Sequence, residues 1–257
     1  MFPITMVGSL PHTDIKEAVK YSVESDIIPF LPELPALGDA MLDYIKKPGE
    51  LSCLKEFTKY DFTTVKIQCV GPATLVYNEY DEEEAIQRAY AHILRIIGGL
   101  HTEEIILFLD EPVLEMVSFD RKRITLNEST LRKFGLLSVD YRKLWERLFA
   151  ALEIKPGLHN ITLGIHTCGN MDWNQLFALD TIQIINFDAS KYGRRLIQSS
   201  EYRSDKRIAW GINERSDVRD FQKGDLLTPP CGMSPLEYSV KDCEIKLKQL
   251  KETFNAL

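Results

Sequence analysis

Residues 161–170 read ITLGIHTCGN. The first five are mostly apolar and suit a strand, whereas the last five are small or polar and include a histidine and a cysteine. A short buried strand followed by a turn with reactive side chains recurs along the whole chain. Strand-like runs are expected at 4–7, 27–31, 63–70, 105–109, 161–165, 181–187, 207–212 and 225–228.

Helical patterns separate these runs. The clearest begins after Asp81, which can cap it with Glu84 three residues on, and its apolar stripe runs from Ile86 to Ile97. Further helices are expected at 14–24, 38–45 and 141–152, and from Ser234 onward. This alternation predicts an α/β fold, a single (β/α)8 TIM barrel over residues 1–257. A doubly wound open sheet is the alternative, although no Gly-rich nucleotide motif follows a strand.

The composition excludes several classes of protein. The 257 residues are 44% hydrophobic and 27% charged, which is typical of a globular chain. The net charge is −7, from 31 basic and 38 acidic residues, and the basic ones are scattered. We therefore expect no nucleic-acid partner and no membrane partner. Five cysteines do not suggest a disulfide framework, and the first residues do not resemble a signal peptide, so a cytoplasmic location is expected.

Polar residues collect where the predicted strands end. In a barrel, these carboxyl ends form one rim that carries the active site. The strand-end residues, in chain order, are Gly8-Ser9, Glu33, Gly71-Pro72, Asp110-Glu111-Pro112, the stretch 166–170, Asp188, Asn213-Glu214 and the stretch 229–232. A chemical role for the chain is therefore expected at this rim.

Three of these side chains suggest a metal site. His166, Cys168 and Cys231 offer one nitrogen and two sulfur ligands, a set that suits zinc, and three protein ligands leave a position open for substrate. The plain alternative is a chance His-x-Cys pair with inert cysteines. Asp188 is a candidate fourth ligand, a partner that orients His166, or only a helix cap.

Four more strand-end residues are candidates for substrate contacts. Asp110 and Glu111 suit acid–base catalysis, although either carboxylate also suits a helix cap or an ion pair. Ser9 can bind a charged end of the substrate or only shape its turn. Ser9, Glu33 and Asp110 are the predicted substrate-binding residues.

The ordered motifs at 7–11, 70–74, 110–112, 166–168 and 230–232 resemble those in the catalytic barrel of cobalamin-independent methionine synthase. The stretch 166–170 also resembles the zinc motif of the methylcobamide:coenzyme M methyltransferases. Both groups belong to the uroporphyrinogen decarboxylase/methionine synthase superfamily. The resemblance implies that His166, Cys168 and Cys231 hold zinc. It also implies that Asp110 binds the amino group of an amino-acid thiol and that Ser9 contacts its polar end.

This resemblance implies a zinc-dependent methyltransferase that acts on a small thiol such as homocysteine. Three features depart from the family: Asp188 stands where methionine synthases have a glutamate ligand, no second barrel precedes this one, and Asn213-Glu214-Arg215 matches neither subfamily. A methylated corrinoid, carried by a separate protein, is therefore the expected donor. The alternatives are a zinc lyase or hydrolase, a decarboxylase-like enzyme, and a non-catalytic protein that handles a corrinoid or a metal.

Overall fold

The computed structural model describes residues 1–115, 140–153, 160–203 and 205–257. The insertion predicted at 115–138 lies, apart from its first residue, outside these ranges. The strands are β1 Asp61–Val70, β2 His101–Asp110, β3 Ile161–Thr167, β4 Ile184–Asp188, β5 Arg207–Gly211 and β6 Leu226–Thr228. The helices of the first half are α1 Ile15–Val23, η1 Pro35–Leu37, α2 Met41–Tyr44, α3 Leu54–Phe57, α4 Pro72–Tyr77, α5 Glu82–Ile97 and η2 Pro112–Glu115. Those of the second half are α7 Tyr141–Glu153, α8 Trp173–Phe177, α9 Ala189–Ile197, η3 Arg215–Asp217 and α10 Val240–Asn255.

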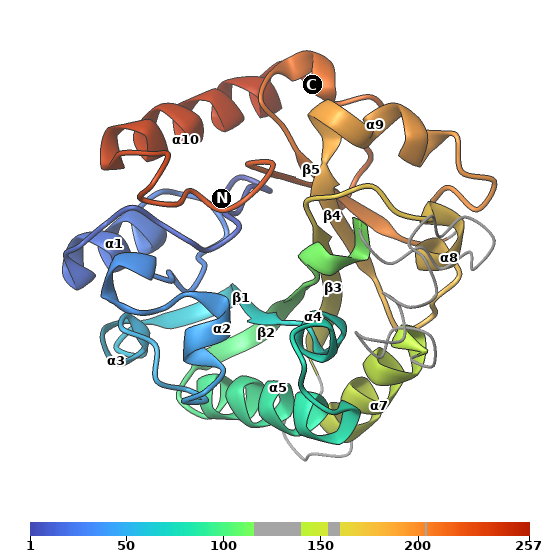
Figure 1. Ribbon diagram of the computed structural model, residues 1–257. Coiled ribbons are helices and arrows are strands. Elements are labelled where there is room, and N and C mark those ends of the chain that lie inside the picture. The colour runs from blue at the N-terminus through green and yellow to red at the C-terminus, as the bar shows by residue number, and fades with distance from the viewer. Residues whose placement is uncertain (116–139, 154–159, 204) are drawn as a thin grey trace.

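The six strands form one curled, all-parallel sheet, with helices around its outer face (Figure 1). Their order in the sheet follows the chain from β1 to β6. A doubly wound sheet instead reverses its strand order at one point, so that alternative was wrong. The register pairs Val70 with Asp110, Asp110 with His166, and His166 with Asn186. The carboxyl ends of β1 to β4 therefore lie side by side, and the polar residues at these ends become neighbours.

The predicted closed eight-stranded TIM barrel was wrong. The first two expected strands, at 4–7 and 27–31, lie between β6 and β1 but form only isolated parallel bridges. Ile4 bridges Leu227 of β6, and Phe30 bridges Lys66 of β1. The sheet is therefore a six-stranded curl whose two edges are linked by extended chain rather than by two further strands.

Prolines explain why these two segments do not form continuous ladders. Pro29 and Pro32 flank Phe30 and Leu31, and Pro3 precedes Ile4. Each proline lacks the backbone N–H that a ladder needs, so the bridges occur singly between them. A side chain adds a further hydrogen bond between the two segments, because the Thr5 hydroxyl donates to the Ile28 carbonyl at 3.2 Å. The apolar runs were correct as extended segments, but they pair with their neighbours through single bridges and not through continuous ladders.

The alternation of side chains divides the core in two. A large cluster fills the space between the sheet and the helices, and a small one lies inside the curl; the small one comprises Ile28, Ile106, Phe108, Ile184, Ala209 and Leu226. Residues two apart in a strand share a face. Asp110 follows Phe108 by two residues, and Asn186 follows Ile184 by two, so both are carried by the inner face. The interior of the curl is thus apolar in its middle and polar at its carboxyl end.

The longest helices agree with their predicted starts only in part. Asp81 caps α5, because its carboxylate accepts the Glu84 N–H at 2.8 Å. The last helix was expected from Ser234, but α10 begins at Val240 and is capped by Ser239 with Asp242. The expected helix at 38–45 is reduced to α2, four residues long. Within the described ranges, no helix combines the length and apolar character needed to cross a membrane.

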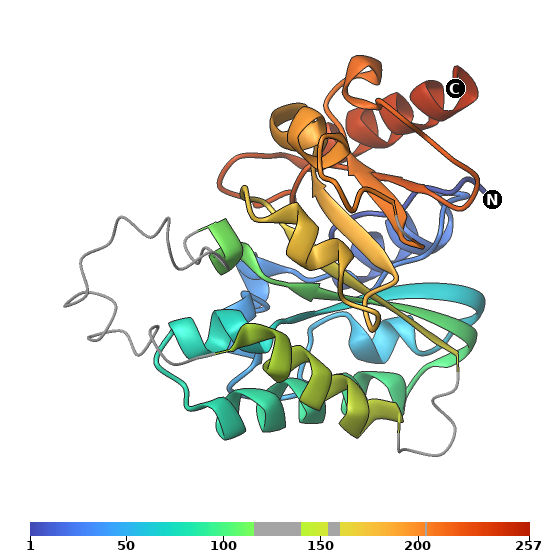
Figure 2. The same ribbon diagram turned by 90° about the vertical axis from the view of Figure 1, so that its right-hand side faces the viewer.

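The last two strands, β5 and β6, are drawn in orange in Figure 2. A buried ion pair between Arg203 and Asp225 lies at their amino ends. The Asp225 carboxylate accepts hydrogen bonds from the Arg203 guanidinium at 2.8 Å, from the Ile208 N–H at 2.9 Å and from the Trp210 indole at 3.0 Å. Asp225 is almost fully buried, and it lies at the opposite end of the sheet from the polar carboxyl ends. Its role is therefore to stabilise the fold.

We expect Asp225→Asn to lower the free energy of unfolding by about 2–3 kcal/mol, since hydrogen bonds to a charged group are lost. Urea unfolding followed by circular dichroism measures this loss. Asp220→Asn is a matched control, because Asp220 shares Arg203 but is more exposed. Equal stability of Asp225→Asn and the wild-type chain would contradict this role.

Candidate metal centre

Three potential metal ligands meet at the carboxyl end of the sheet. His166 is the second-last residue of β3, Cys168 directly follows this strand, and Cys231 comes from the loop after β6. The His166 Nε2 lies 3.1 Å from the Cys168 Sγ, and the two sulfurs are 2.9 Å apart. Each residue offers one ligand atom, and these atoms all lie within 4.8 Å of one another. The cluster could hold a metal ion, and no other group of three such side chains occurs in the described ranges.

Asn186 orients the imidazole of His166. The His166 Nδ1 lies 2.6 Å from the Asn186 Oδ1, while the Asn186 amide donates to the Ala209 carbonyl at 2.8 Å and to the Thr228 hydroxyl at 2.9 Å. Because both amide hydrogens are used, the Asn186 oxygen must accept, and Nδ1 carries the proton. The Nε2 is then free to act as a ligand. The sequence analysis missed Asn186, although a lone polar residue in the apolar run 184–187 was a usable signal.

In the metal-free cluster, the contacts between the side chains favour one thiolate, that of Cys231. Hydrogen bonds from Cys168 and then from His166 lower the pKa of Cys231 to about 4. The bond to Cys231, together with burial, raises the pKa of Cys168. Burial opposes protonation of His166, but the contact with Cys231 and the charge of Asp110 outweigh it and raise its pKa. Ligation through both sulfurs would therefore release a proton from Cys168.

Asp188, the predicted fourth ligand, has other partners. Its carboxylate accepts the Ser190 hydroxyl at 2.5 Å and the Lys191 N–H at 3.3 Å, and it forms an ion pair with the Lys191 Nζ at 3.1 Å. These contacts cap α9. The structure thus places Asp188 at the same end of the sheet but does not bring it into the three-ligand cluster, and its role as a ligand stays a prediction.

Four buried polar side chains lie inside the curl beside the metal cluster; we call Glu33, Lys66, Gln68 and Asp110 the interior charge cluster. The Lys66 ammonium donates to the Val7 carbonyl at 2.7 Å and to the Gln68 side-chain oxygen. Within the described part of the chain, the Asp110 Oδ1 and the Glu33 Oε1 have no hydrogen-bond partner. Buried carboxylate oxygens are normally paired, so these two oxygens are suited to accept a hydrogen bond from a ligand.

Burial sets the charge balance of this cluster. It raises the pKa of Asp110 to about 6, against the charges of His166 and Lys66. Burial and the neighbouring charge of Asp110 raise the pKa of Glu33 well above its usual range. Burial lowers the pKa of Lys66 to about 8, although both carboxylates oppose this change. Burial thus favours the neutral forms of all three groups, and a further cation beside Asp110 and Glu33 would favour the charged forms of these two carboxyl groups.

Glu111 lies next to Asp110 but contacts different groups. Its carboxylate accepts the Ala73 N–H at 3.0 Å, the Thr74 N–H at 2.7 Å, the Thr74 hydroxyl at 2.6 Å and the Trp145 indole at 2.7 Å. Burial raises its pKa to about 7. These bonds join the end of β2 to the start of α4 and to α7. They account for the position of Glu111 in structural terms, and its predicted catalytic role stays a prediction.

Ser9 lies between the two clusters. It bridges Glu33, and its carbonyl accepts the Met233 N–H from the loop that carries Cys231, at 2.9 Å. The predicted substrate residues Ser9, Glu33 and Asp110 are therefore brought together with the metal cluster. The sequence analysis missed Lys66 and Gln68. They lie within the predicted strand at 63–70, whereas the candidate residues were sought where the strands end.

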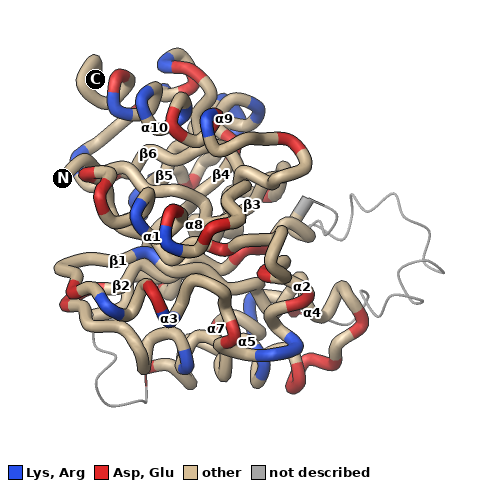
Figure 3. The backbone as a smooth tube through the Cα atoms, turned by 90° about the vertical axis from the view of Figure 1, so that its left-hand side faces the viewer, with Lys and Arg blue, Asp and Glu red and all other residues tan. Residues whose placement is uncertain are grey.

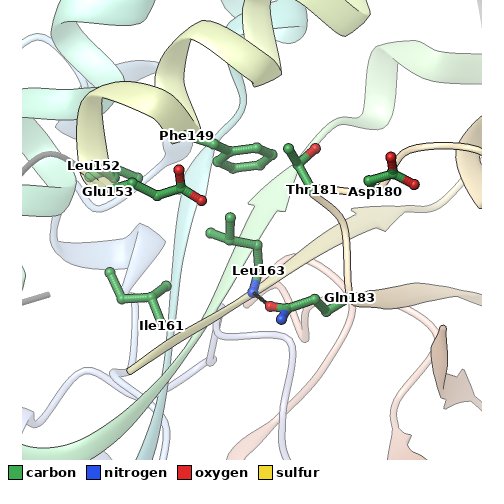
Figure 4. A pocket seen from close by; sticks show the side chains of 8 residues that line it. All are labelled: Phe149, Leu152, Glu153, Ile161, Leu163, Asp180, Thr181 and Gln183. Atoms are coloured by element: carbon green, nitrogen blue, oxygen red, sulfur yellow. Dashed lines mark hydrogen bonds between the residues drawn. The ribbon is translucent and has the colours of Figure 1, made fainter. Parts of the chain in front are cut away.

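A separate pocket lies at the opposite end of the sheet (Figure 4). It lies beside Ile161, the first residue of β3, and Gln183, which directly precedes β4. Figure 4 shows Glu153 and Asp180 on either side of Phe149 and Thr181, with the Gln183 side chain accepting the Leu163 N–H at 2.9 Å. This pocket lacks the nitrogen and sulfur ligands of the other end, so the metal centre remains the candidate functional site.

No protein-family model and no curated protein matches this chain. The assignment of the site therefore depends on its geometry and on the chemistry of its side chains.

Proposed function

We propose that this protein is a zinc-dependent methyltransferase that transfers a methyl group to a small thiol. The observation that carries the proposal is the cluster of His166, Cys168 and Cys231 beside buried carboxylates. One nitrogen and two sulfur ligands suit zinc, and three protein ligands leave one position for substrate. Bound zinc would lower the pKa of a substrate thiol and so favour the thiolate. Without the metal, such a thiol is a poor nucleophile at neutral pH.

The interior charge cluster supports an amino-acid thiol as the acceptor. The unpartnered oxygens of Asp110 and Glu33 suit the ammonium group of such a molecule. An ammonium bound at this place would favour the charged forms of both carboxyl groups, against the effect of burial. Ser9 lies next to Glu33 and suits a contact with the polar end of the same ligand. Homocysteine has this combination of an ammonium group and a thiol.

A methyl-transfer assay with purified protein tests the proposal. It combines the zinc-loaded protein with a methyl donor and a panel of thiols that includes homocysteine and a thiol without an amino group. We expect methylation of the amino-acid thiol, and loss of that activity after the metal is removed by a chelator. Zinc-dependent hydrolysis or elimination without methyl transfer would instead support the lyase or hydrolase alternative.

We expect the methyl donor to be a corrinoid rather than a folate. A polyglutamylated folate needs a basic tract for its tail, whereas acidic and basic residues are interspersed along the backbone (Figure 3). A corrinoid on its own carrier protein needs only access to the open end of the sheet. Thiol methylation should therefore be detectable with methylcobalamin and absent with methyl-folate. Comparable turnover with methyl-folate alone would overturn this choice.

Such a protein is expected to work in the cytoplasm, where the two cysteine ligands stay reduced. Its expected partners are the thiol and the corrinoid carrier protein.

A further inference from the structure

The loop that carries Cys231 has few anchors. From residue 229 to residue 233, its one bond between two backbone groups in the described chain runs from the Met233 N–H to the Ser9 carbonyl. Gly232 packs directly on Ser9, since a Cβ at Gly232 would lie 2.9 Å from the Ser9 Cβ. Pro230 packs on β5, since a Cβ at Gly211 would lie 2.9 Å from the Pro230 Cα. The position of Cys231 therefore depends on β5 on one side and on the turn that carries Ser9 on the other.

This turn is held from inside the curl by β1. The Lys66 Nζ donates to the Val7 carbonyl at 2.7 Å and also to the Gln68 side-chain oxygen. Gly8 has a φ of +129°, and a Cβ there would lie 1.4 Å from the Gln68 Nε2. The amide of Gln68 thus occupies the space next to Gly8, and Lys66 holds both that amide and the backbone before it.

A lysine at this place needs an explanation, because its ammonium is fully buried. Burying an ammonium is costly unless it is paired and hydrogen-bonded, and an apolar side chain of the same length would pack without that cost. Lys66 also approaches the ring of Phe108, with its Nζ 5.3 Å from the ring centroid. Its polar contacts all lead to the Val7–Ser9 turn or to the interior charge cluster.

We propose that Lys66 is a positioning residue for the metal centre. By holding the Val7 carbonyl and the Gln68 amide, it fixes the turn that carries Ser9, and this turn fixes the loop that carries Cys231. The inference rests on the metal-binding part of the proposed function, but not on methyl transfer.

Titration of the metal-free protein with Co²⁺ tests this inference. Lys66→Met removes the ammonium and keeps the length of the side chain. Loss of a direct hydrogen-bond partner of a metal ligand weakens metal affinity by about 10–100-fold. Because Lys66 acts on Cys231 through a turn, we expect a loss near the lower end of this range, about 10-fold. The thiolate-to-cobalt absorption per bound ion should also fall, because Cys231 loses its fixed position. Lys248→Met is the matched control, since Lys248 is exposed on α10 and, among the residues that the structure describes, its one ion pair is with Glu252 at 3.7 Å.

Wild-type affinity and absorption in a folded Lys66→Met protein would overturn the inference and leave the metal centre intact. If wild-type protein binds no Co²⁺, the metal centre itself is overturned, and this inference with it. If Lys66→Met does not fold, Gln68→Leu provides the same test, because it removes the second acceptor of Lys66. Weaker Co²⁺ binding by folded Gln68→Leu supports the inference, and wild-type binding contradicts it.

Discussion

Cys168→Ser and Cys231→Ser should each lose nearly all of the zinc that the wild-type protein retains, about one ion per chain. A serine hydroxyl stays protonated at neutral pH and is a poor zinc ligand, so each variant keeps only two ligands. We expect the zinc affinity to fall by more than about 100-fold, beyond the 10–100-fold typical for residues that only support a ligand. Metal analysis after dialysis against a weak chelator measures this loss.

Cys243→Ala is the control for these two variants. Cys243 is a free cysteine, buried on α10 and outside the ligand cluster, so its removal should leave the zinc content unchanged. Wild-type zinc content in both serine variants would show that the cluster is not the metal site. Unfolding measured in parallel separates loss of the metal from loss of the fold.

Asp110→Asn should weaken the binding of an amino-acid thiol by about 10–100-fold, because a charge-assisted hydrogen bond to the ammonium group contributes roughly 1.5–3 kcal/mol. The stability of the protein should change little. Burial raises the pKa of Asp110 to about 6, so the folded state favours the neutral form more than the unfolded chain does. The stability linked to this proton is present below about pH 4 and is lost as the pH rises through 6. A neutral amide avoids that loss at pH 7.

Calorimetric titration with homocysteine and thermal unfolding at pH 7 together test the role of Asp110. The opposite pattern is expected for Asp225→Asn, which should destabilise the fold and leave thiol affinity unchanged in the folded protein. A large drop in melting temperature with normal thiol binding in Asp110→Asn would contradict a substrate role and indicate a structural ion pair.

The positions of the six strands could be predicted because each is a compact apolar run that ends in polar residues. Because all six strands run in the same direction, His166, Cys168 and Cys231 meet at one end of the sheet. Their places near the predicted strand ends indicated this. The two segments nearest the N-terminus have the same apolar character. Sequence periodicity did not show that these segments, interrupted by Pro3, Pro29 and Pro32, would form single bridges in place of continuous ladders.

The supporting residues of the site were harder to predict. Asn186 matters because it lies beside His166 in the sheet register, and Lys66 because its ammonium reaches the Val7 carbonyl. Neither contact follows a fixed spacing in the sequence, because each joins two residues that lie far apart in the chain. Membership of the methionine synthase superfamily and a corrinoid as methyl donor stay predictions, and the methyl-transfer assay tests the second of them.

The bridge between Ile4 and Leu227 also has a consequence for the timing of folding. On a ribosome, Ile4 emerges long before Leu227, and synthesis at about 5–20 residues per second separates them by roughly 10–45 s. The segment at 2–9 must wait for that time without its partner in β6. Contacts between residues so distant in sequence also slow folding, because a long loop must close before they form. The N-terminal segment is therefore expected to dock on β6 only after residues 226–228 have been synthesised.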